Sequence, residues 1–108
     1  MFGKEKRIEK ENKLLLRIYD LILNKQTNED ERTILIEFKN SVESGKDFEL
    51  ETMKLAETLR LLGLKKFNNN DQLTPDVGKL YTDIFSTGLV KKELGRGIVA
   101  LSFLANIH

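Results

Sequence analysis

The chain has 108 residues, with 18 Lys and Arg against 17 Asp and Glu, so its formal net charge is +1. This length supports one hydrophobic core and predicts a single helical-bundle domain over residues 1–108. The charge balance excludes generic binding of DNA or RNA by a polycationic face, so we expect no nucleic-acid partner. The absence of cysteine excludes disulfides and thiolate metal sites, a pattern typical of a cytosolic protein.

An amphipathic helix is predicted over residues 4–25. Its apolar face contains Ile8, Leu15, Ile18, Tyr19 and Ile22. Further leucines widen this face, namely Leu14, Leu16, Leu21 and Leu23. A helix that is apolar over so much of its surface is expected to contact neighbours on more than one side.

A second helix is predicted over residues 28–44. Asn28 lies three residues before Glu31, the spacing of a capping box, and the acidic first turn suits the positive end of the helix dipole. Gly45 is expected to adopt the left-handed conformation that ends many helices. The expected core residues are Ile34, Leu35, Phe38 and Val42.

The third helix is predicted over residues 48–63, with Asp47 as its N-cap. Gly63 and the basic pair at 65–66 are the signals that predict its end, and a polar loop is expected to follow. The expected core residues are Met53, Leu55, Ala56, Leu59 and Leu62.

The fourth helix is predicted over residues 75–87, because Thr74 can cap it and Pro75 suits the first helical position. Its expected core residues are Val77, Leu80, Tyr81, Ile84 and Phe85. Four amphipathic helices with short or moderate connections predict an all-α fold, an antiparallel four-helix bundle.

The C-terminal segment, residues 89–108, combines a basic, glycine-containing stretch with an apolar end. Residues 97–108 carry no Asp, Glu, Lys or Arg, and they are too few to cross a bilayer as a helix. Two interpretations stay open, since the apolar end can pack on the bundle as a short extension or contact a partner. The candidate partner-binding residues are Lys91, Lys92, Arg96, Ile98, Val99, Leu101, Phe103 and Leu104.

Residue types that usually perform catalysis are nearly absent. The single histidine is the terminal residue, His108, and no cysteine is present. Carboxylates lie beside lysine and arginine on exposed helical faces, and the run from Asn68 to Asp71 lacks the ligand spacing of a calcium loop. We therefore expect no enzyme activity, no cofactor and no metal site.

Several segments, in order along the chain, resemble the enterocin A immunity family of bacteriocin immunity proteins. They are LLRIYDLILN (15–24), SGKDFE (44–49), LAETL (55–59), LTPDVGKLY (73–81) and GLVKK (88–92) followed by GRG (95–97). The resemblance covers nearly all of the chain. Its motifs are packing and turn residues rather than a catalytic signature.

The resemblance implies a helical bundle made by a Gram-positive bacterium, cytoplasmic and peripheral at the inner face of the membrane. Such proteins give resistance to pore-forming, pediocin-like (class IIa) antimicrobial peptides. They are thought to act at the receptor, a mannose phosphotransferase permease with bound bacteriocin, and their C-terminal part carries specificity. The alternative function is a small regulatory or scaffold bundle that binds a partner protein.

Overall fold

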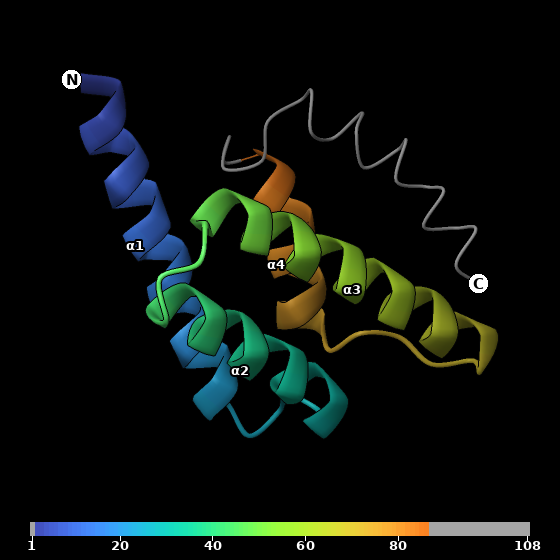
Figure 1. Cartoon of the computed structure of the whole chain (residues 1–108). Helices are drawn as coiled ribbons and strands as arrows, with labels where there is room; N and C mark the ends of the chain where they lie inside the picture. The colour runs from blue at the N-terminus through green and yellow to red at the C-terminus, as the bar shows by residue number, and fades with distance from the viewer. Residues whose placement is uncertain (1, 87–108) are drawn as a thin grey trace.

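The computed structural model describes the backbone of residues 2–86 and the side chains of residues 7–85. It contains the four helices α1 (Phe2–Leu23), α2 (Glu29–Glu43), α3 (Phe48–Asn68) and α4 (Pro75–Ser86), and no strand in the described range. α2 packs against both α1 and α3, and α3 also contacts α4; α2 and α3 run in opposite directions (Figure 1). The predicted all-α helical bundle is confirmed, whereas the predicted packing of residues 89–108 lies outside the described residues.

The predicted helix starts are explained by local hydrogen bonds. The carboxylate of Asp47 accepts from the backbone N–H of Leu50 at 2.8 Å, which confirms Asp47 as the N-cap of α3. α4 begins at Pro75 as predicted, but no bond from the Thr74 hydroxyl to its own helix accompanies this start. That hydroxyl donates instead to the carbonyl of Gln26, at 3.3 Å, and so links α4 to the α1–α2 connection.

The predicted end of the third helix at Gly63 is wrong, because α3 continues to Asn68. Residues 64–67 are good helix formers, and Lys66 is buried in contact with the start of α2, so tertiary packing outweighs the glycine signal. The helix ends where Asn70 adopts a φ of 59°, the left-handed conformation that asparagine tolerates.

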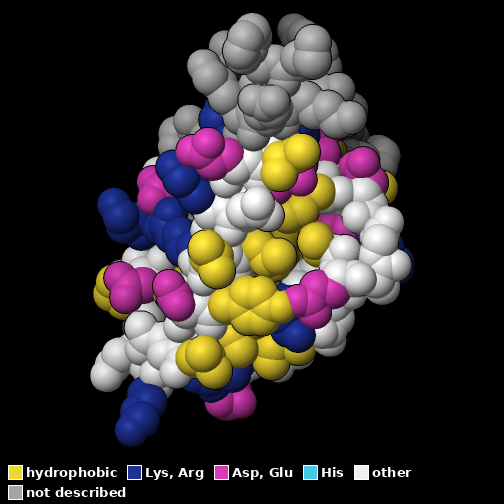
Figure 2. Space-filling view, turned by 90° about the vertical axis from the view of Figure 1, so that its left-hand side faces the viewer, with side chains coloured by type: hydrophobic (Ala, Val, Ile, Leu, Met, Phe, Trp, Pro, Cys, Tyr) yellow, Lys and Arg dark blue, Asp and Glu magenta, His cyan; other side chains and the backbone are white. Residues whose placement is uncertain are grey.

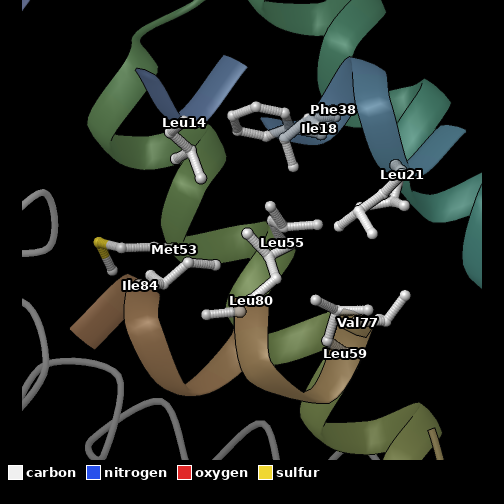
Figure 3. Close-up of a cluster of buried hydrophobic side chains, with 12 residues drawn as sticks. Leu14, Ile18, Leu21, Phe38, Met53, Leu55, Leu59, Val77, Leu80 and Ile84 are labelled. Atoms are coloured by element: carbon white, nitrogen blue, oxygen red, sulfur yellow. The ribbon is translucent and has the colours of Figure 1, made fainter. Parts of the chain in front are cut away.

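The hydrophobic core draws on all four helices (Figure 3). Its buried members are Leu14, Ile18, Leu21, Leu35, Phe38, Met53, Leu55, Ala56, Leu59, Val77, Leu80 and Ile84. Ile18, Leu35 and Leu59 are fully buried, with relative exposures of 0%. On each helix the core residues are mostly three or four positions apart and so form one face, and the core lies where these faces meet.

Two of the predicted core faces differ from the structure. α1 buries Leu14, Ile18 and Leu21, whereas Ile8 is 49% exposed, so the buried face is rotated from the predicted one. Phe85 was expected in the core but is 50% exposed. In α1 and in α4, apolar residues occupy a wider arc of the helix than the arc that is covered by neighbouring helices, so some of them stay exposed.

A buried carboxylate joins three helices at one end of the bundle. Glu31 is fully buried, and its two oxygens accept the backbone N–H groups of Asn28, at 3.0 Å, and Thr74, at 2.8 Å. The ammonium group of Lys66 lies 3.5 Å from both Glu31 and Asp30. These contacts connect the starts of α2 and α4 to the last turn of α3.

Arg32 closes the end of α1 at the same end of the molecule. Its guanidinium donates to the carbonyls of Ile22 and Asn24, both at 2.8 Å, and of Thr27, at 3.0 Å. It also forms an ion pair with Glu29. Carbonyls near the end of α1 that lack intrahelical partners therefore receive donors from α2.

Candidate functional site

The eight residues predicted to bind a partner, from Lys91 to Leu104, lie outside the described residues. α4 is the described helix that directly precedes them in the chain, and α4 packs on α3. The candidate site consists of exposed side chains of these two helices.

Both helices leave large apolar side chains exposed to solvent. Leu61, Leu64 and Phe67 are 45%, 50% and 75% exposed, and their three-residue spacing places them along one side of α3. On α4, Phe85 is 50% exposed. We call these four residues the α3–α4 face. Exposed apolar groups that recur along one side of a helix are typical of a surface that contacts a partner.

Tyr81 and an ion pair on α3 border this face. The rings of Tyr81 and Phe85 meet edge to face with centroids 5.4 Å apart. Arg60 binds Glu57 through two hydrogen bonds of 3.1 and 2.6 Å. Burial raises the pKa of Tyr81, the charge of Arg60 opposes that rise, and the charge of Glu57 adds to it. The hydroxyl of Tyr81 therefore stays protonated at neutral pH and can donate a hydrogen bond.

A hollow of about 480 Å³ opens beside the face, between the second half of α3 and the start of α4. Its wall includes Phe67, Leu73 and the two glycines Gly63 and Gly78. A Cβ atom on Gly63 would lie 3.5 Å from Leu73, at ordinary contact distance, so the missing side chain contributes to the open space. The hollow can receive an apolar side chain of a partner.

The α3–α4 face offers apolar side chains for contact, and the ring of Tyr81 lies beside Phe85. Within residues 2–86 no group of His, Cys, Asp and Glu is arranged to hold a metal ion. The same range contains no helix that is long and apolar enough to span a membrane. The arrangement therefore offers apolar contact, with a tyrosine hydroxyl at its border.

Residues 9–87 of the chain match the bacteriocin immunity protein family. This range includes α2, α3 and α4 in full and most of α1. The chain belongs to the bacteriocin immunity protein family. This membership confirms the family suggested by the sequence motifs, and the family is not one of enzymes. No curated protein and no solved structure matches the chain.

The family match and the described structure cover nearly the same part of the chain, residues 9–87 and 2–86. The match ends at residue 87, so the eight predicted partner-binding residues lie beyond it. Leu64 and Phe67 were not predicted as site residues, because the predicted third helix ended at Gly63, and Leu61, inside that predicted helix, was not singled out either. A helix continued through residue 67 would have placed these three residues along one side.

Proposed function

We propose that this immunity protein protects the cell that carries it against pediocin-like peptides by acting on the membrane receptor complex from the cytosolic side. Family membership supports bacteriocin immunity in general. The observation that supports the mechanism is the α3–α4 face, where four large apolar side chains of α3 and α4 remain exposed. The mannose phosphotransferase permease with bound bacteriocin is the proposed partner, as the family resemblance implies.

The C-terminal segment is assigned a complementary role. Lys91, Lys92 and Arg96 approach the anionic inner leaflet or an acidic receptor loop, where each cation contributes about 1 kcal/mol near a negative surface. The apolar residues between positions 98 and 104 supply apolar contact to the same partner. Cytoplasmic localisation, peripheral at the inner face of the membrane, is part of this proposal.

Expression in a sensitive strain tests the proposal. The full chain should preserve survival and prevent potassium leakage when at least one pediocin-like peptide is added, and the permease should copurify when peptide is present. Protection from no member of a peptide panel would reject immunity of this class. Undiminished protection after removal of residues 97–108 would reject the role of that segment.

The role of the α3–α4 face has a matched control on the same helix. Leu64→Glu should abolish protection, whereas Leu50→Glu should preserve it, because these leucines are 50% and 47% exposed but lie about 21 Å apart along α3. Both variants should unfold at similar urea concentrations, since neither side chain is in the core. Equal protection by the two variants would contradict the assigned role of the face.

The hollow beside Leu73 also fits the alternative function, a regulatory or scaffold bundle that receives a partner's side chains in an apolar groove. Affinity purification separates the two functions. Recovery of the permease only after peptide addition supports immunity at the receptor. A cytosolic partner recovered equally with and without peptide would support the scaffold.

A further inference from the structure

The outer side of α1 carries an apolar band that the proposed function does not use. After the buried face of α1 is accounted for, Ile8, Leu16 and Leu23 remain 49%, 64% and 80% exposed. Together with Asn12 and Tyr19 they recur every three or four residues, which places all five on one side of the helix. We call these five residues the α1 band.

Figure 2 views the molecule from the side on which α1 lies in Figure 1. Hydrophobic side chains gather there in a band down the middle of the surface, with charged side chains beside it. Scattered exposed leucines need no explanation, but apolar residues repeated along four turns of one helix are typical of a helix–helix interface.

We infer that the α1 band is the interface of a homodimer in which α1 of one copy packs antiparallel on α1 of a second copy. With the twofold axis at Leu16, this residue meets its own copy. Ile8 then lies within one residue of the level of Leu23 in the second copy, or about 1.5 Å. Asn12 lies equally close to the level of Tyr19, where the amide can bond to the phenol oxygen. The band is therefore complementary to itself in this orientation.

The charges beside the band fit the same arrangement. Lys13 and Asp20 lie on one flank of α1, and both side chains are exposed. In an antiparallel pair each flank faces the same flank of the other copy, so Lys13 of one copy comes to within one residue of the level of Asp20 in the other. The ion pair that Lys13 makes within its own helix, 3.4 Å from Glu9, is exposed and easily exchanged.

An anionic lipid surface suits the band less well than a second copy does. Glu9 and Asp20 lie on one flank of the band, and their charges would repel anionic headgroups. On the other flank Lys39 lies 5.7 Å from the ring centroid of Tyr19 but is paired with Glu43 at 3.6 Å. Each flank of the band thus carries an acidic group paired with a lysine, Lys13 on one side and Lys39 on the other, without the excess of cations that borders helices lying on membranes.

Dimerisation through α1 leaves the α3–α4 face open, because the two surfaces share no residue. One helix per copy is a small interface, so we expect reversible association at the weak end of the range for specific complexes. Sedimentation equilibrium from about 10 μM to about 1 mM should show the average mass rising from monomer towards dimer. A constant monomer mass over this range would overturn the inference.

Cysteine cross-linking tests the position of the axis, because the natural chain has no cysteine. Under mild oxidation Leu16→Cys should give a disulfide-linked dimer at low concentration, since a residue on the axis faces its own copy. Leu64→Cys, at a site 50% exposed on α3, is the control and should cross-link much more slowly. Equal rates for the two variants would overturn the assigned interface.

Charge reversal tests the orientation of the pair. Lys13→Asp should weaken self-association several-fold, and Lys13→Asp combined with Asp20→Lys should restore it. The helix content of all three proteins should be the same by circular dichroism, because both side chains are exposed. Failure of the double variant to restore association would overturn the antiparallel arrangement.

Discussion

Glu31 is the residue whose surroundings constrain substitution most. Its oxygens accept two backbone N–H groups from different helices and also lie near the ammonium group of Lys66. In Glu31→Gln one oxygen becomes an NH₂ group, which cannot accept a hydrogen bond, so one of the two backbone N–H groups loses its partner. The substitution also removes the negative charge beside Lys66. We expect unfolding free energy to fall by about 3 kcal/mol.

Urea unfolding followed by circular dichroism measures this loss. Glu29→Gln is the control, because the Glu29 side chain is 87% exposed in the first turn of the same helix. That change should alter stability by less than about 0.5 kcal/mol. Similar midpoints for the two variants would show that the buried contacts of Glu31 contribute little.

Two glycines should respond in opposite directions to the same substitution. Gly45 has a φ of +97°, where a side chain is strained, so Gly45→Ala should destabilise the protein by about 1 kcal/mol. Gly63 lies inside α3, and an added methyl group would make ordinary contact with Leu73 at 3.5 Å. Gly63→Ala should therefore stabilise the protein by about 0.5–1 kcal/mol.

Thermal unfolding compares these two alanine variants directly. The melting temperature should fall for Gly45→Ala and rise for Gly63→Ala. A fall for both would mean that the hollow beside Leu73 cannot accept a methyl group without displacement of its wall.

Among the helices, the end of α1 depends on a residue of α2. Arg32 donates to three carbonyls, and Arg32→Met keeps much of the apolar stem while it removes these bonds. We expect a loss of about 2 kcal/mol in unfolding free energy. Arg32→Lys should recover little of it, because a single ammonium group cannot reproduce the planar guanidinium fork.

Arg60→Met is the control for this loss. Arg60 also makes a two-bond contact, but with Glu57 on the surface of the same helix, so its removal should cost about 0.5 kcal/mol. Chemical denaturation of the three variants gives the comparison. A loss for Arg60→Met as large as that for Arg32→Met would argue against a special role of Arg32.

The sequence predicted the existence and type of the helices better than their faces. Helix spacing and caps identified all four helices, and the ends of three agree with the structure to within two residues. On α1 the apolar residues cover more than one side, so periodicity could not show that Leu14 rather than Ile8 faces the core. The end of α3 depends on a contact of Lys66 with α2, which local signals do not contain.

The candidate site was predictable only in part. The motifs indicated the family, and the match over residues 9–87 confirmed it. The basic and apolar residues between Lys91 and Leu104 stay a prediction. The α3–α4 face was missed in part because Leu64 and Phe67 follow Gly63, a residue that usually marks a helix end. The exposure of Leu61 and Phe85 depends on how α3 and α4 pack, which local signals do not contain.

In the molecule as a whole, the described part of the hydrophobic core already draws on all four helices. The core residues of the described range fall between Leu14 and Ile84. A chain shortened by residues 97–108 should therefore keep its helical circular dichroism signal and a cooperative thermal transition. Loss of that transition would mean that the segment is required for folding, and that the truncation cannot test protection on its own.

The contacts of Glu31 and Arg32 also make the bundle mechanically asymmetric. Glu31 holds Thr74, the residue before α4, while Asp83 near the other end of α4 pairs with Arg17 where both side chains are about one-third exposed. A force applied to the C-terminus would therefore peel α4 from its last turn towards Thr74 and stop where the buried carboxylate holds the chain. Such a pull would therefore act on the core residues Ile84 and Leu80 before it reaches Thr74.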